Sequence, residues 1–134
     1  MDSLGWIFRI KKINDSKEQL SILCSMDNPT QNLNHGPDSG EHLDSIEIWD
    51  NEKQWKINIG TEDGEMLKAR AEVNDWMPTR LSSKFGFDYS PTDYIPYGFN
   101  TKVPDLEKDE LIYFQYLVAV DKYDEKNIST WFAV

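Results

Sequence analysis

The sequence predicts a mainly β protein: an antiparallel β-sandwich with one short helix, in a single domain over residues 1–134. About seven segments place apolar residues at every second position, as half-buried strands do. Turn-forming residues separate these segments, and a chain of 134 residues is the usual size of one domain. A β-rich α+β sheet would satisfy the same observations.

The first half of the chain predicts two hairpins joined by a loop. Residues 4–13 and 20–26 each keep their apolar side chains on one parity, which predicts two strands paired with each other. Residues 46–48 and 55–59 show the clearest hairpin pattern. The segment 28–40 is rich in Asn, Pro, Gly and Ser and is expected to be a long exposed loop.

The second half predicts further strands and the helix. Residues 67–73 contain good helix formers, but their strict alternation favours a strand. A proline begins the segment 78–85, which predicts one short helix there. The segment 87–104 is interrupted by proline and glycine and is expected to be irregular. The apolar run 111–120 predicts a central strand covered on both faces, and 129–134 a closing strand.

Negative charge is concentrated in one stretch of the chain. Residues Asp27 to Glu65 hold ten carboxylates against Lys53 and Lys56, which accounts for −8 of the net charge of −10. Such a field favours cationic partners and speeds encounter with them. It opposes contact with nucleic-acid phosphates or anionic membranes, so neither is an expected partner.

The expected location is the cytoplasm. The sequence has no run of about 18 apolar residues, and its first residues lack the basic region and apolar run of an export signal. Cys24 is the one cysteine, so it cannot form an internal disulfide, which fits a reducing compartment.

Histidine and cysteine give little sign of catalysis. His35 and His42 are seven residues apart, which matches no standard zinc pattern, and solvated loop histidines are the simpler interpretation. Cys24 shares its parity with Leu20 and Ile22, as a small core residue does. No Gly-x-Ser-x-Gly elbow or phosphate-binding glycine loop occurs. No metal, cofactor or catalytic residue is therefore predicted.

Carboxylates and aromatic residues leave two alternative functions open, a glycosidase and a carbohydrate- or peptide-binding protein. Glu47, or Asp93 between Tyr89 and Tyr94, could belong to a carboxylate pair of a glycosidase, but carboxylates at this density meet by chance. An aromatic platform could bind a carbohydrate or a peptide, although packing in a region with few aliphatic residues is simpler. The residues of that platform would be Trp76, Tyr89, Tyr94 and Tyr97.

The acidic series predicts a protein-binding surface. Its carboxylates would complement an Arg- and Lys-rich site on another protein, with two tryptophans as anchors among them. The alternative is a polar rim that keeps a small domain soluble. The predicted partner-binding residues are Asp38, Glu41, Asp44, Glu47, Trp49, Asp50, Glu52 and Trp55.

Taken whole, this small, acidic, tryptophan-rich chain without a catalytic motif resembles the immunity proteins of bacterial toxin systems. The resemblance is one of class and implies a non-enzymatic inhibitor that neutralises a cognate toxin, often a basic nuclease. Two alternatives stand beside it: a phage-encoded DNA mimic that inhibits a host nucleic-acid enzyme, and a carbohydrate- or peptide-binding β-sandwich.

Overall fold

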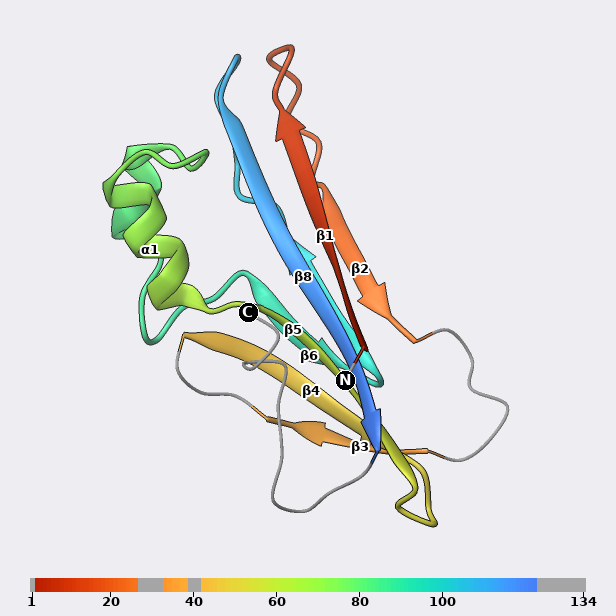
Figure 1. Ribbon diagram of the computed structural model, residues 1–134. Coiled ribbons are helices and arrows are strands. Elements are labelled where there is room, and N and C mark those ends of the chain that lie inside the picture. The colour runs from red at the N-terminus through yellow and green to blue at the C-terminus, as the bar shows by residue number, and fades with distance from the viewer. Residues whose placement is uncertain (1, 27–32, 39–41, 123–134) are drawn as a thin grey trace.

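The computed structural model describes residues 2–26, 33–38 and 42–122 and shows two antiparallel sheets with a helix at one end (Figure 1). The larger sheet has the order β1 (Asp2–Lys11), β8 (Leu111–Lys122), β5 (Trp55–Glu62), β4 (Leu43–Trp49) and β3 (Asn34–Pro37). The smaller has the order β2 (Ser21–Ser25), β7 (Gly98–Lys102) and β6 (Thr92–Ile95). These two packed sheets confirm the predicted mainly β, sandwich-like fold class.

One part of the core lies between the two sheets. Ile46, Ile48 and Ile59 of the larger sheet are buried against Phe99 of β7. The Ile46–Ile59 and Ile48–Ile57 pairs face each other across β4 and β5, so the predicted hairpin of 46–48 with 55–59 is confirmed.

A polar link also crosses the sandwich. The hydroxyl of Tyr116 on β8 donates to Thr101 Oγ1 on β7, which is 3.1 Å from Thr92 Oγ1 on β6. Because all three residues are buried, these hydrogen bonds fix how the sheets lie on each other.

The second part of the core lies under α1 (Gly64–Glu72) and the short 3-10 helix η1 (Thr79–Ser83). Their apolar residues cover the half of β8 that extends beyond β5 and pack on Ile112, Phe114 and Tyr116. Residues buried on the helical side are Leu67, Ala71, Met77, Leu81 and Phe85. The predicted helix at 78–85 is thus present as a 3-10 turn. No helix among the described residues is long and apolar enough to cross a membrane.

The prediction of a strand at 67–73 was wrong, because these residues belong to α1. Asp63 caps the helix by accepting a hydrogen bond from the Met66 amide at 2.9 Å. The helix ends at Glu72, and Asn74 just beyond it takes a φ of 51° and bonds its amide to the Ala71 carbonyl. Leu67 and Ala71 are buried as a pair four residues apart, whereas Val73 is 74% exposed. The alternation was incidental to this helical spacing.

The predicted pairing of 4–13 with 20–26 was also wrong. Both segments contain strands, but β1 pairs with β8 and β2 pairs with β7. β1 is also more exposed than a half-buried strand: Trp6 and Phe8 are each 43% exposed. β8 is central, between β1 and β5, as predicted for 111–120, although its outer face is only partly covered.

Two segments predicted to lack regular structure contain strands. The segment 87–104 forms the β6–β7 hairpin, in which Tyr97 takes a φ of 61° at the turn. The segment 28–40 contains β3, which pairs with β4. Backbone pairing to a neighbouring strand outweighs the low strand propensity of Gly, Pro and Asn at these positions. The predicted closing strand at 129–134 lies outside the described residues.

Candidate protein-binding surface

β4 carries predicted site residues on both of its faces. Glu47 and Trp49 are two residues apart, so both lie on the outer face of the larger sheet, and both are half-buried. Burial raises the pKa of Glu47, nearby Lys56 opposes that rise, and Asp38 adds to it. Asp38 follows β3 and accepts a hydrogen bond from the Asn58 side chain at 3.3 Å. The structure therefore brings three of the predicted residues, Asp38, Glu47 and Trp49, to the same part of the sheet.

Asp44 lies near the other end of β4 and has the opposite parity to Glu47. Its carboxylate accepts a hydrogen bond from the Ser90 hydroxyl at 3.2 Å. Burial raises the pKa of Asp44, the Ser90 bond opposes that rise, and the charge of Asp63 adds to it. Asp44 therefore does not share a face with Glu47.

The remaining predicted residues lie at the tip of the β4–β5 hairpin. Asp50 is only 9% exposed, and its Oδ1 accepts hydrogen bonds from the amides of Gln54 at 2.7 Å and Trp55 at 3.2 Å. Its carboxylate holds the turn, so it is not offered to a partner. Glu52 is exposed and Trp55 is half-buried at the start of β5. Glu41 lies outside the described residues.

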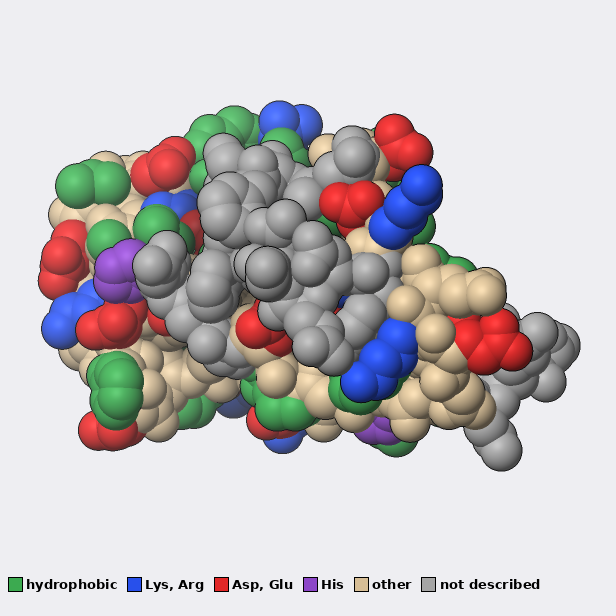
Figure 2. Space-filling view, turned by 60° about the horizontal axis from the view of Figure 1, so that its bottom comes forward, with side chains coloured by type: hydrophobic (Ala, Val, Ile, Leu, Met, Phe, Trp, Pro, Cys, Tyr) green, Lys and Arg blue, Asp and Glu red, His purple; other side chains and the backbone are tan. Residues whose placement is uncertain are grey.

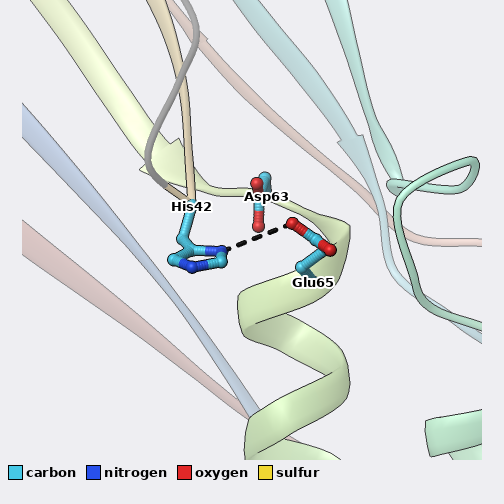
Figure 3. A group of neighbouring side chains, drawn as sticks. All are labelled: His42, Asp63 and Glu65. Atoms are coloured by element: carbon cyan, nitrogen blue, oxygen red, sulfur yellow. Dashed lines mark ion pairs between the residues drawn. The ribbon is translucent and has the colours of Figure 1, made fainter.

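A further acidic group lies at the start of α1. Figure 3 shows His42, Asp63 and Glu65 pointing toward one another, with His42 Nδ1 3.5 Å from Glu65 Oε2. Asp63 and Glu65 were not among the predicted site residues, because a strand at 67–73 hid the helix start that brings them to His42. The signal was available: an Asp ahead of a run of good helix formers is a typical N-cap.

The fold explains why these three side chains lie together. One nitrogen of His42 and one carboxylate oxygen each from Asp63 and Glu65 lie within 4.8 Å of one another, a spacing at which such atoms can hold a metal ion. However, Asp63 Oδ1 already accepts from the Met66 amide, and Glu65 pairs with His42. Carboxylates in the first turn also stabilise the positive end of the helix. We therefore assign the group to capping of α1.

The aromatic residues of the alternative platform have separate surroundings. Tyr97 donates to the Leu33 carbonyl at 3.0 Å and packs on His35, whereas Tyr94 packs on Phe99. Tyr89 stacks with Phe85. Trp76 lies away from them under the guanidinium of Arg9, which is 5.5 Å from its ring. Each ring thus has its own packing partner, although Trp76, Tyr89 and Tyr94 remain 45%, 54% and 42% exposed.

On the face of the molecule shown in Figure 2, acidic side chains lie in several separate places rather than in one patch. The described acidic side chains of residues 27–65 occupy two places at opposite ends of β4. One is the start of α1, near Asp44. The other is the outer face of β4 and the hairpin tip, with Glu47 and Glu52. Seven residues of strand separate these ends by about 20 Å. Comparison of the chain with family models, with curated proteins and with solved structures finds no match.

Proposed function

We propose that this protein is a non-enzymatic inhibitor that binds a cationic protein through the carboxylates along β4. The observation that carries the proposal is the charge of −8 between residues 27 and 65. That stretch contains β3, β4, β5 and the start of α1, and the exposed carboxylates described within it lie at the two ends of β4. In its most specific form, the proposal is an immunity protein that acts in the cytoplasm on a bacterial toxin with a basic active site.

The physical basis is charge complementarity. Carboxylates that face a basic site speed association and exclude wrong partners, while half-buried aromatic side chains slow dissociation. Glu47 and Trp49 supply both properties on one face of β4. Glu52 and Glu65 are exposed at the two ends of the strand and extend the field.

The partner can be identified by capture from a lysate of the native host, at low and at raised salt. We expect one basic protein to be retained, with less retained as salt rises, because exposed charges are screened within about 8 Å at physiological ionic strength. A toxin whose activity is lost on binding supports the immunity function. A nucleic-acid enzyme displaced by duplex DNA supports the DNA mimic instead.

Charge reversal then tests the surface. The triple variant Glu47→Lys, Glu52→Lys and Glu65→Lys is expected to associate at least ~10-fold more slowly with the captured partner, because electrostatic steering contributes 10- to 1000-fold. Asp50 is left intact because its loss would disturb the turn. The matched control reverses three exposed carboxylates elsewhere, at Glu18, Glu72 and Asp88.

Equal association by the triple variant, the control and the parent would remove β4 from the proposal. Tryptophan fluorescence that changes with a glycan or peptide, independently of salt, would favour the carbohydrate- or peptide-binding alternative.

A further inference from the structure

β1 leaves one long edge of the larger sheet unpaired among the described residues. The Lys12 amide bonds to the Glu110 carbonyl at 3.1 Å, and the Lys12 carbonyl accepts from the Asp109 amide at 2.6 Å. The amide and carbonyl of one residue in an antiparallel strand point to the same side, and successive residues alternate. Even-numbered residues of β1 therefore bond to β8, and odd-numbered residues point their backbone groups to the free edge. These residues are Ser3, Gly5, Ile7, Arg9 and Lys11.

Over residues 3–8, this edge lacks the features that normally prevent strands from pairing between molecules. β1 is ten residues long, and residues 3–8 carry no charge. Leu4 is 59%, Ile7 54%, and Trp6 and Phe8 each 43% exposed. In contrast, the edge strands β3 and β6 have four residues each, and β3 ends in Gly36 and Pro37. Short strands and prolines block edge pairing, whereas long apolar edges promote it.

We propose that β1 pairs antiparallel with β1 of a second copy of this chain, which forms a two-fold dimer with one continuous sheet. Since the backbone groups of odd-numbered residues point to the free edge, the two-fold axis can pass between Ile7 of one copy and Ile7 of the other. This register places Trp6 opposite Phe8 of the second copy and Leu4 opposite its Ile10. Asp2 then lies opposite Lys12 of the second copy, so the charges at the two ends of the strand are complementary.

The charge distribution also favours this edge over the rest of the molecule. Residues 1–12 carry Asp2 against Arg9, Lys11 and Lys12, a net charge of +2 in a chain of −10. The acidic stretch forms the opposite side of the same sheet, ending in β3 (Figure 1). Pairing through β1 thus keeps the two acidic regions far apart and leaves β4 of each copy open to the proposed cationic partner.

The first test is the mass in solution by light scattering over a range of concentrations. We expect the mass to rise toward twice 15.6 kDa. Ile7→Pro removes an amide that points to the free edge and makes no bond to β8. We therefore expect this variant to keep the monomer mass and an unchanged thermal unfolding temperature. Leu23→Lys changes a side chain that is 67% exposed on β2 and should dimerise as the parent does. A monomeric parent at ~0.5 mM, where even a weak Kd of ~0.1 mM would give mostly dimer, would overturn the proposal.

Cysteine cross-linking tests the register and does not depend on the proline variant. In a Cys24→Ala background, mild oxidation of a mixture of Trp6→Cys and Phe8→Cys should give a disulfide-linked heterodimer, because directly opposed residues lie within disulfide reach. Neither variant alone should cross-link in this register. Cross-linking of Trp6→Cys alone would overturn the axis through Ile7.

Two other occupants of the edge are distinguishable by hydrogen exchange. Protection of the odd-numbered β1 amides that increases ~10-fold with protein concentration supports the dimer. Protection that appears only when the cognate partner is added would overturn it in favour of a strand from that partner. Dimerisation that appears only after removal of residues 123–134 would overturn it in favour of that segment as the native occupant.

Discussion

Arg70 joins α1 to the strands through a buried ion pair. Its Nη1 donates to Glu62 Oε1 at 2.9 Å and to the Tyr113 carbonyl at 3.1 Å, while Nη2 donates to the carbonyls of Asp75 and Trp76. The Arg70 and Glu62 side chains are only 7% and 4% exposed. Burial raises the pKa of Glu62, and the charge and hydrogen bond of Arg70 oppose that rise. Glu62 thus depends on Arg70 to remain ionised.

We expect Arg70→Met to lower the free energy of unfolding by about 3–5 kcal/mol, because it leaves Glu62 buried without its partner. Adding Glu62→Gln should restore part of this loss by removing the stranded charge. Urea unfolding of the two variants measures both effects. The control is Lys102→Met, since Lys102 and Asp93 are exposed and 4.0 Å apart, and such a pair contributes about 1 kcal/mol at most. Equal losses at Arg70 and Lys102 would contradict the structural role of the buried pair.

The buried Tyr116 hydroxyl makes the stability of the sandwich depend on pH in the alkaline range. Burial raises the pKa of Tyr116 to about 12, against the smaller opposing effect of its bond to Thr101. The folded protein therefore holds this proton more tightly than the unfolded chain, whose tyrosine has a pKa of about 10. The contribution to stability is complete below pH 10 and is lost as pH rises toward 12. Thermal unfolding from pH 9 to 12 should show a smaller decline for Tyr116→Phe than for the parent; parallel declines would contradict this assignment.

The start of α1 depends on a close approach of two backbones. A Cβ on Gly64 would overlap the carbonyl oxygens of Tyr89 and Gly86, and neither oxygen can move without shifting its segment. A Cβ on Gly86 would meet no atom within 4 Å. We expect Gly64→Ala to destabilise the protein by more than about 2 kcal/mol, as overpacking against backbone does, and Gly86→Ala to change stability by less than about 1 kcal/mol. Urea midpoints of the two variants measure this difference, and similar midpoints would mean that α1 can move away from this turn.

Across the molecule, the acidic surface should lose charge earlier on acidification than exposed carboxylates do. Burial raises the pKa of both Asp44 and Glu47, so both are ionised fully only at pH values above their raised pKa. In both residues the folded state disfavours the ionised form, so protonation does not itself unfold the protein. We expect association with the cationic partner to slow as the pH falls toward these raised pKa values, before exposed carboxylates are protonated. Asp44→Asn combined with Glu47→Gln should flatten this dependence in stopped-flow measurements; an unchanged profile would exclude these two residues.

The β-rich fold class followed from local pattern alone. Alternation at Ile46, Ile48, Ile57 and Ile59 indicates strands with one buried face, and this signal does not depend on which strand pairs with them. A short acidic turn between the two runs indicates that they pair with each other. The same pattern placed the predicted binding residues Glu47, Trp49 and Glu52 on that hairpin, where the structure has them. Local signals at Asp63 and Asn74 also bound α1, but the prediction did not use them and relied on the alternation at 67–73.

What the sequence by itself determined is therefore the class of fold and the concentration of charge, because both depend on residues close together in the chain. The tertiary structure decided which strands pair. β1 lies on β8 and β2 on β7, where Ile10 of β1 and Ile22 and Cys24 of β2 pack against the shared core, so proximity along the chain does not select the partner. The tertiary structure also decided that Asp50 holds a turn and that Asp44 and Glu47 lie on opposite faces of β4. It likewise brought His42 to Asp63 and Glu65. Each of these depends on contacts that no local pattern encodes.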